Sequence, residues 1–497
     1  MKRQISTDRQ PWVRTAIYSF MTLTVTVIVA LLMLVVLGYQ FNNKDGKLEQ
    51  GGLLQFESIP TGAAVTLDNL RLGSLTNTKS TVDAGNHFVK YTLTGYRQWQ
   101  KSIDVRAGQI GWLSYARLIP TDIKSETLHE YDTLTGAVAS PSHRYMLLHE
   151  AIDSSSFTLA DIQGDTLRYA TLNLPTTVFT PTATGKAQYF TIDSWSNDDN
   201  TVLIRHAYDD GSKTEWILLN RASPEKSINI NTAYGISPLS VKFAGGGDNL
   251  LFVQTDDTVR RINLDEQTLS RPLASKVARF SIFDEKTIIY ATVPDDKGSL
   301  SVAYAAVDIA SPVTLGTYTD DKKPVFTTMM SYFGKRYVAI VHGQTLTVTY
   351  GTLPTLTDKG SMKPFATQAI TGNTYELVAS SNNRFFVTQQ LRGFSTYDIE
   401  LKKSDTTTWA GPQPDSHFDE NLAEVQVRPL QWLDDYSLRS DAGNMLRFYD
   451  FDGANQQDIM PVAQGFDATL SQNNKYLYAI AKTDNGFTLE RARMILK

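Results

Sequence analysis

The chain has 497 residues, 41% of them hydrophobic, so it is long enough to form more than one domain with a substantial core. It has 47 basic and 52 acidic residues, a formal net charge of −5, and no cysteine. The acidic balance argues against a nucleic-acid partner, because neutralising phosphates requires clustered Lys and Arg. The lack of cysteine excludes disulfides, thiolate nucleophiles and cysteine-based metal sites.

The first element is a long apolar segment between Arg14 and Lys44, a stretch without any charged residue. Its residues 16–39 would form a helix of about 36 Å, which is long enough to cross a bilayer. Tyr18 and Tyr39 near its ends are suited to the membrane interface. The alternative is a cleaved secretory signal, whose apolar core is about 7–15 residues long and precedes a small-residue cleavage site. The longer core and the lack of such a site in "VVLGYQFNN" favour an uncleaved anchor.

Charge flanking this segment predicts its orientation. Residues 1–15 hold four basic side chains and one acidic side chain. Because positively charged flanks stay in the cytoplasm, we expect 1–15 to be a cytoplasmic tail and everything after the 16–39 helix to be extracytoplasmic. The polar, glycine-containing residues 40–52 are interpreted as a flexible linker.

Residues 53–120 form the next predicted unit, a small β-domain. The stretches "AVTLD", "HFVKYTL" and "KSIDVRA" alternate apolar and polar residues, as strands with one buried face do. Glycines fall between these strands, where a turn often requires positive φ. They are Gly62, Gly73, Gly85, Gly95 and Gly108.

The order of these motifs resembles the PEGA domain, a small β-sandwich of bacterial surface proteins. Pro60-Thr61-Gly62-Ala63 stands for the eponymous Pro-Glu-Gly-Ala, and "AGNHFVKYTLTGY" matches the later Gly-x-His and Gly-Tyr elements. Thr61 in place of the acidic residue and Asn69 in place of the usual glycine are departures. The resemblance implies binding or display rather than catalysis, and structural roles for the motif residues. These are Pro60, Gly62, Ala63, Asp68, Gly73, Gly85, His87, Gly95 and Tyr96.

Three aromatic residues of the same unit form a candidate contact patch: Tyr96, Trp99 and Trp112. Large aromatic side chains contribute much of the binding energy where they are exposed. The alternative is that these three cover the core of the domain.

From residue 121 onward a short hairpin recurs. The copies are "SPSHRYMLL", "WSNDDNTVLI", "AGGGDNLLFV", "IFDEKTIIY", "SYFGKRYVAI", "SSNNRFFVTQ", "WLDDYSLRS" and "LSQNNKYLYA". Their spacing of about 47 residues is close to that of four-stranded propeller blades, and they resemble the hairpins of TolB-like and WD40-like propellers. The last copy has room for three strands only, and "SETLHEYDTL" near residue 125 could supply the fourth and close the ring. We therefore predict a β-propeller at 121–497 with eight blades, or seven if one copy is an insertion.

A search for catalytic and metal-binding patterns gives no candidate residue. The seven histidines are scattered, and none has a ligand spacing such as H-E-x-x-H. The turns "NDDN", "YDDGS" and "YDFDGANQQD" lack the spacing and closing Glu of a calcium loop, and hairpin turns favour the same residues. "GFSTY" lacks the second glycine of a nucleophile elbow. The sequence predicts no catalytic residue, metal or cofactor.

The predicted fold is an all-β ectodomain, a PEGA-type sandwich plus a propeller, on a single N-terminal transmembrane helix. The predicted function is non-enzymatic: a single-pass bacterial cell-membrane protein that displays its propeller to bind another envelope protein. Alternatives are a binder of peptidoglycan or another cell-wall polymer, and an enzyme whose site lies in the propeller channel. Carboxylates or histidines converging in the channel would favour the enzyme, and a broad exposed apolar patch would favour binding.

Overall fold

The computed structural model describes residues 10–36, 39–42, 47–319, 323–355, 357–390, 393–408, 430–441 and 444–496. The chain divides into two compact units, Met1–Asp122 and Ile123–Lys497. This boundary lies two residues after the predicted one. Most of the predicted tail, residues 1–9, lies outside the described residues.

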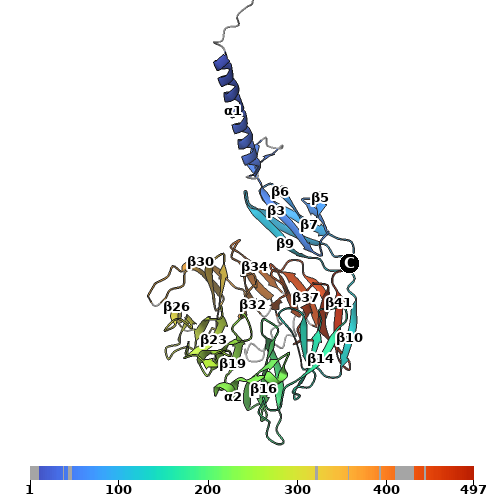
Figure 1. The fold of residues 1–497 in the computed structure, drawn as a ribbon, viewed down its shortest axis with the longest axis vertical. Helices are drawn as coiled ribbons and strands as arrows, with labels where there is room; N and C mark the ends of the chain where they lie inside the picture. The colour runs from blue at the N-terminus through green and yellow to red at the C-terminus, as the bar shows by residue number, and fades with distance from the viewer. Residues whose placement is uncertain are drawn as a thin grey trace, which may run out of the picture. The chain divides into compact units, whose positions relative to one another are not determined.

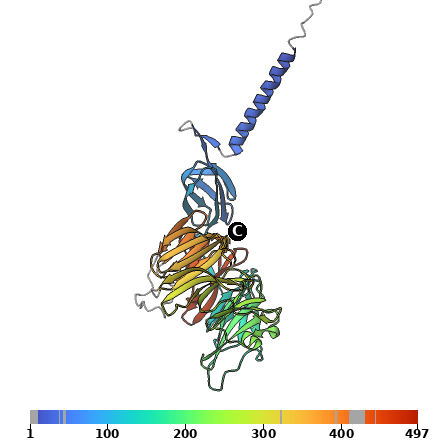
Figure 2. The same cartoon turned by 90° about the vertical axis from the view of Figure 1, so that its left-hand side faces the viewer.

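The N-terminal helix α1 (Gln10–Val36) runs without interruption (Figures 1 and 2). Its apolar part, Trp12–Leu34, has a mean hydropathy of 2.3 and is long enough to cross a membrane; a secretory signal would share these properties. Threonine hydroxyls inside it donate to carbonyls one turn earlier, for example Thr22 Oγ1 to Tyr18 O at 2.9 Å. A hydroxyl that makes such a hydrogen bond costs little free energy when it is placed in an apolar environment.

The described part of the predicted linker belongs mostly to a β-hairpin, which corrects the expectation of a flexible segment. Strands β1 (Tyr39–Asn42) and β2 (Lys47–Gln50) form an antiparallel hairpin. Its register places Tyr39 opposite Gln50 and Phe41 opposite Leu48. The predicted transmembrane end is also corrected, because Tyr39 belongs to this hairpin and the described helix ends at Val36.

The first unit continues as a sandwich of two sheets, as predicted. One sheet has the order β6-β3-β9 and the other β5-β4-β7-β8. The strands are β3 (Gly52–Ile59), β4 (Ala64–Leu67), β5 (Leu70–Leu75), β6 (Thr78–Val82), β7 (Gly85–Thr92), β8 (Trp99–Val105) and β9 (Ile110–Arg117). Alternate residues of both sheets fill one core, which includes Leu54, Phe56, Val65, Tyr91 and Trp99.

The Pro60–Ala63 turn is held by one side chain. Thr76 Oγ1 accepts hydrogen bonds from Gly62 N at 3.0 Å and Ala63 N at 2.9 Å. Gly62 has a φ of 91°, a region open to glycine, whereas Gly73 lies inside β5 and has no positive φ. The expectation of a turn at Gly73 was therefore wrong.

A second motif turn joins β4 to β5. Asp68 and Asn69 both have positive φ, the conformation of a tight hairpin. The Asp68 carboxylate accepts from Phe88 N at 2.8 Å and is hydrogen-bonded to His87 Nδ1 at 2.6 Å. His87 thereby joins this turn to β7, and its Nε2 lies 2.7 Å from the carbonyl oxygen of Asp83.

The second unit consists, within the described residues, of eight four-stranded antiparallel sheets. Figure 1 shows them following one another around the unit, from β14 through β16, β19, β23 and β30 to β37 and β41. In chain order the first four are β11–β14 (Gly136–Ala139, Tyr145–His149, Ser156–Asp161, Arg168–Asn173), β15–β18 (Tyr189–Trp195, Thr201–Tyr208, Lys213–Asn220, Ile228–Asn229), β19–β22 (Ser240–Phe243, Leu250–Thr255, Thr258–Asn263, Thr268–Leu269) and β23–β26 (Val277–Ile282, Thr287–Thr292, Ser299–Ala306, Val313–Thr319). The next three are β27–β30 (Val325–Tyr332, Lys335–His342, Thr345–Gly351, Lys363–Ala369), β31–β34 (Thr374–Ala379, Phe385–Gln390, Gly393–Asp398, Lys403–Thr408) and β35–β38 (Leu430–Trp432, Ser437–Asp441, Met445–Asp450, Gln457–Pro461). A short helix, α2 (Ile230–Tyr234), follows β18, and a 3-10 turn, η2 (Pro224–Lys226), precedes it.

The eighth sheet closes the ring as predicted. Its order is β10-β41-β40-β39, with β10 (Ser125–Tyr131) from the start of the unit and β39 (Thr469–Leu470), β40 (Tyr476–Thr483) and β41 (Gly486–Arg493) from its end. Ser125 pairs with Ala492 and Tyr131 with Phe487. Eight blades, not seven, are therefore present in the described residues.

The second strands of the first six sheets, β12, β16, β20, β24, β28 and β32, each pack against both neighbouring sheets. Consecutive side chains on a strand point to opposite faces, so one packs onto the preceding sheet and the next onto the following sheet. Seven of the eight junctions are apolar clusters of this kind. Each is represented by one pair: Leu147 with Val202, Leu203 with Val253, Phe252 with Ile288, Ile289 with Val338, Ala339 with Phe386, Val387 with Leu438, and Leu148 with Tyr478. At these seven junctions the apolar core lies between two sheets, so each sheet depends on its neighbours for burial.

The repeated hairpins share one turn chemistry in four copies. A serine at the first position accepts from the backbone N–H five residues later: Ser140 from Tyr145, Ser196 from Thr201, Ser380 from Phe385 and Ser471 from Tyr476. The fourth position has positive φ in each, and is His143, Asp199, Asn383 or Asn474. Asp and Asn tolerate this conformation, which explains their recurrence in the sequence.

Candidate functional site

The first strands of the eight sheets line a common channel. A cavity of about 1240 Å³ is bounded by residues of β15, β19, β23, β27 and β31. A second cavity of about 390 Å³ is bounded by residues of β11, β15, β35 and β39. The two share Asp193, Ser194 and Trp195, so together they run along the axis on which all eight sheets converge. A large cavity with a few convergent polar groups is the first candidate for a binding site.

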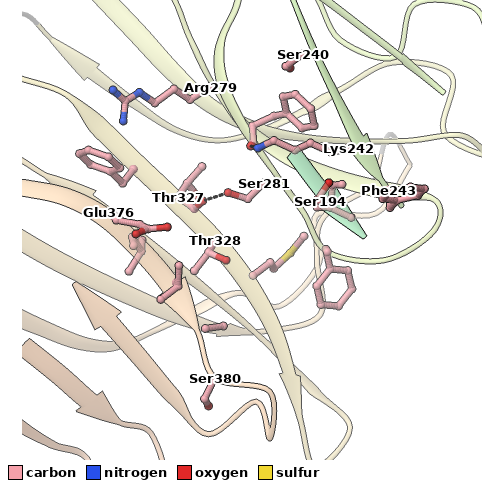
Figure 3. A pocket seen from close by; sticks show the side chains of 18 of the residues that line it. Ser194, Ser240, Lys242, Phe243, Arg279, Ser281, Thr327, Thr328, Glu376 and Ser380 are labelled. Atoms are coloured by element: carbon pink, nitrogen blue, oxygen red, sulfur yellow. Dashed lines mark hydrogen bonds between the residues drawn. The ribbon is translucent and has the colours of Figure 1, made fainter. Parts of the chain in front are cut away.

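Four charged side chains from different sheets enter the larger cavity: Asp193, Lys242, Arg279 and Glu376. Figure 3 shows Lys242, Arg279 and Glu376 reaching into it from separate strands, beside Thr327 and Thr328. The wall between them is rich in hydroxyls, and Ser281 Oγ donates to Thr327 O at 2.8 Å. The two basic and two acidic groups give the cavity no net charge.

These charges are only partly compensated by neighbouring groups. Lys242 Nζ donates to Phe280 O at 3.3 Å, and the Asp193 carboxylate accepts from Ser194 Oγ at 2.9 Å. The Arg279 guanidinium lies 4.6 Å from the ring centre of Phe326. Within the described part of the chain, neither Arg279 nor Glu376 forms an ion pair. The channel therefore presents charges of both signs that a ligand could satisfy.

The channel walls shift the pKa of three of these groups. Burial lowers the pKa of Lys242, although the fields of Asp193 and Glu376 oppose the change. Burial raises the pKa of Asp193 and of Glu376, and Lys242 opposes both changes. All three side chains remain open to the channel, so the effect comes from the protein atoms that surround them.

The smaller cavity carries a different set of groups. The Arg439 guanidinium lies 3.6 Å from the Asp467 carboxylate, and burial lowers the pKa of this arginine. His143 Nδ1 lies 2.7 Å from Thr469 Oγ1, and burial together with nearby Arg439 lowers the pKa of His143. Thr469 is only 3% exposed, so its hydroxyl is not presented to a substrate. Among the described residues no cluster of His, Asp and Glu suited to a metal ion is found.

The contact patch predicted on the sandwich is not formed. Trp99 is 2% exposed and stacks on Tyr91 in the core, with ring centres 5.0 Å apart, because it occupies an inward position of β8. Tyr96 is half-buried and forms a β-bridge with Pro120. Trp112 alone is well exposed, at 50%. The alternative, that these residues cover the core of the domain, holds for Trp99 and Tyr96 but not for Trp112.

The channel residues were missed by sequence reasoning. Each charged residue stands in a first strand of a different repeat, and successive repeats are tens of residues apart. The only local signal for a channel residue is a charged residue that interrupts the apolar pattern just before a hairpin. Examples are Lys242 before "FAGGG" and Glu376 before "LVASS".

Comparisons with known proteins bear on both units. Residues 52–118 match the family model of the PEGA domain. No match was found among curated protein sequences. Among solved structures, Citrobacter koseri AztD is 11% identical, covering 81% of this chain and 96% of its own, with a TM-score of 0.38. Kluyveromyces lactis Hsv2 is 7% identical, covering 73% and 99%, with a TM-score of 0.39.

Oligogalacturonate lyase from Vibrio parahaemolyticus is 8% identical, covering 67% of this chain and 96% of its own, with a TM-score of 0.38. The architecture of the second unit rests on the strand pairing and inter-sheet packing of this chain itself. The chain therefore carries a PEGA domain at residues 52–118, followed by an eight-bladed β-propeller.

Proposed function

We propose that the protein is a membrane-anchored binding protein of the bacterial cell envelope. Helix α1 anchors it with the N-terminus in the cytoplasm, and the propeller channel binds a segment of another envelope protein. The anchor is supported by the length and apolarity of Trp12–Leu34 and by the basic residues before it.

The observation that carries the proposal is the set of incompletely paired charges of both signs in the channel. A neutral glycan would remove Arg279 and Glu376 from water without supplying a charged partner to either, which is unfavourable. A polypeptide segment bearing basic and acidic side chains would pair with both and would use the wall hydroxyls for its backbone. A protein ligand therefore fits the channel better than an uncharged polymer.

The test is a binding comparison with the full chain in lipid nanodiscs. Wild type, Arg279→Gln, Glu376→Gln and the surface control Lys213→Gln are incubated with a solubilised envelope fraction, and the protein retained is identified and titrated. We expect each channel variant to weaken binding about tenfold, the value of one charged hydrogen bond, and the control to leave it unchanged. Equal binding by all four proteins would exclude the channel as the site.

The same experiment separates the alternatives. Retention of peptidoglycan fragments by wild type, without any protein, would support a cell-wall polymer binder. The carboxyl groups of Asp193 and Glu376, whose pKa burial raises, are the groups an acid catalyst in the channel would use. Conversion of the retained polymer into products by wild type but not by Glu376→Gln would identify an enzyme.

A further inference from the structure

The sandwich exposes a small apolar patch on the outer face of its β6-β3-β9 sheet. Ile110 is 54% exposed and Trp112 is 50% exposed, two residues apart on the edge strand β9. Leu53 on β3 is paired with Ile110, is half-buried, and points to the same face, because paired residues of neighbouring strands share a face. Leu53, Ile110 and Trp112 are called the outer-face patch below.

The patch lies at the end of the sandwich where the chain arrives from helix α1. The β1–β2 hairpin returns the chain, so that Gln50 lies opposite Tyr39. Gly108 N donates to Gly51 O at 2.9 Å and Leu53 N to Gln109 O at 3.0 Å, which ties the start of β9 to the same point. The other end of β3 and β9 is marked by the pairing of Ile59 with Arg117.

Chain length limits the distance from the patch to the anchor. Paired strands lie about 5 Å apart, and the three residues from Gln50 to Leu53 span at most about 10 Å. Ile110, one further strand away, is therefore within about 20 Å of Tyr39 by these limits. Helix α1 spans about 40 Å at 1.5 Å per residue, close to the full thickness of a bilayer with its headgroups. Because the chain between α1 and the sandwich is this short, the end of the sandwich that holds Leu53 and Ile110 reaches the headgroup layer.

The chemistry of this face suits that layer. Tryptophan concentrates at membrane–water interfaces, and an isoleucine beside it adds apolar area that the headgroup boundary can bury. Gln55 of β3 is paired with Trp112 on one side and with Lys79 of β6 on the other, so the exposed Lys79 adds a positive charge to the same face, two strands from Trp112. A lysine on the same face as the tryptophan favours contact with anionic lipids.

We propose that the outer-face patch rests on the membrane surface, with Leu53, Ile110 and Trp112 in the headgroup layer beside the anchor. The proposal depends on the membrane anchoring proposed above. The PEGA domain would then be a spacer held at a fixed tilt on the bilayer, not a module turning freely above it.

The natural absence of cysteine permits a direct test by site-directed spin labelling of the full chain. Ile110→Cys places a nitroxide in the patch. Leu70→Cys, at a residue 74% exposed on β5 of the other sheet, is the matched control. Val27→Cys, inside the apolar part of α1, reports on the anchor. The proteins are reconstituted in vesicles of phosphatidylethanolamine and phosphatidylglycerol, and label accessibility to oxygen and to a water-soluble nickel chelate is measured.

We expect the label at 110 to be several-fold less accessible to the nickel chelate than the label at 70, and more accessible to oxygen. Equal values at 110 and 70, with a lipid-buried label at 27, would overturn the docking proposal alone. A water-accessible label at 27 would show that the anchor itself is wrong. A label at 110 that neither reagent reaches would indicate contact with protein instead of lipid, and would also overturn the proposal. Unchanged thermal unfolding of the three variants serves as the folding control.

Discussion

The PEGA domain and the propeller are both built from β-sheets, yet they are stabilised in different ways. The sandwich has one core between two sheets, and its turns depend on single side chains such as Thr76 and the pair Asp68–His87. In the propeller the apolar clusters lie between sheets, and one serine turn recurs in four blades. The sandwich therefore depends on particular residues, whereas the propeller depends on repetition and on closure of the ring.

The largest effect is expected from Trp99→Ala in the sandwich core. Removing this buried ring from its contact with Tyr91 should cost about 3–5 kcal/mol, a large part of the stability of so small a domain. Hydrogen exchange followed by mass spectrometry in increasing urea should show peptides from 52–118 losing protection early, while peptides from 123–496 keep their midpoint. Trp112→Ala, in the same domain but exposed, should change stability by less than about 0.5 kcal/mol. Loss of both units together would contradict their independence.

Closure of the ring is tested by a pair of identical truncations. Leu489→Ala in β41 and Leu203→Ala in β16 each remove a fully buried leucine and should cost about 2–5 kcal/mol. Leu489 lies on the strand that pairs with β10, so its truncation should raise hydrogen exchange first in β10 and β39–β41. Leu203→Ala should leave the exchange of β10 unchanged until the whole propeller unfolds. The same exchange pattern in both variants would mean that the closing sheet is no weaker than the others.

The repeated turn predicts a smaller effect. Ser380 Oγ accepts from Phe385 N at 2.9 Å, so Ser380→Ala leaves a buried N–H without that acceptor and should cost about 1–2 kcal/mol. Ser381→Ala removes the neighbouring hydroxyl, whose contact with Asp435 is exposed, and should cost less than about 0.5 kcal/mol. Thermal unfolding of both variants measures the difference. Equal losses would show that the serine turn does not stabilise the blade.

The smallest effect concerns pH. The pKa of Asp68 is lowered, first by the hydrogen bond from Phe88 N, and that of His87 is raised by its hydrogen bonds to Asp68 and Asp83 O despite opposing burial. The Asp68 contribution is present above its ordinary pKa of 3.8 and is lost as pH falls; the His87 contribution is present below 6.5 and is lost as pH rises. The pair should therefore stabilise the sandwich most between these values, by less than about 1 kcal/mol because Asp68 is exposed.

His87→Gln isolates this effect because glutamine does not titrate. Sandwich stability, followed by urea midpoints from pH 4 to pH 8, should decline in wild type as pH rises through the neutral range and decline less in the variant. Parallel pH profiles would assign the decline to other groups.

Much of the fold could be predicted because its signals are local. Alternation with period two and the Ser/Asn/Asp turns mark each hairpin. The last repeat has only three strands of its own, which indicated that β10 completes its sheet and closes the ring. It was harder to predict which alternate residues of a single strand face the core. Trp99 faces the core because β8 starts with an inward residue. The hairpin at Tyr39–Gln50 was missed because its polar residues concealed the alternation of Tyr39, Phe41 and Leu48.

The channel could not be predicted for a different reason. Ring closure decides which strands face one another across the channel. The alternation of each first strand decides which of its side chains point into the channel, and neighbours in sequence decide neither. Lys242 and Glu376 line one cavity although two whole sheets, β23–β26 and β27–β30, lie between their strands in the chain. A single sequence contains their identities but not their convergence.

The most direct test of the central claim is crosslinking from inside the channel in intact cells. A photoreactive thiol reagent is attached to Ser240→Cys, which lines the larger cavity, and to Ala222→Cys, an exposed position after β17. The account predicts an adduct with one envelope polypeptide from position 240, none from position 222, and its loss when Arg279→Gln and Glu376→Gln are added. Equal adducts from both positions, or adducts at 240 that persist without the two charges, would contradict the account.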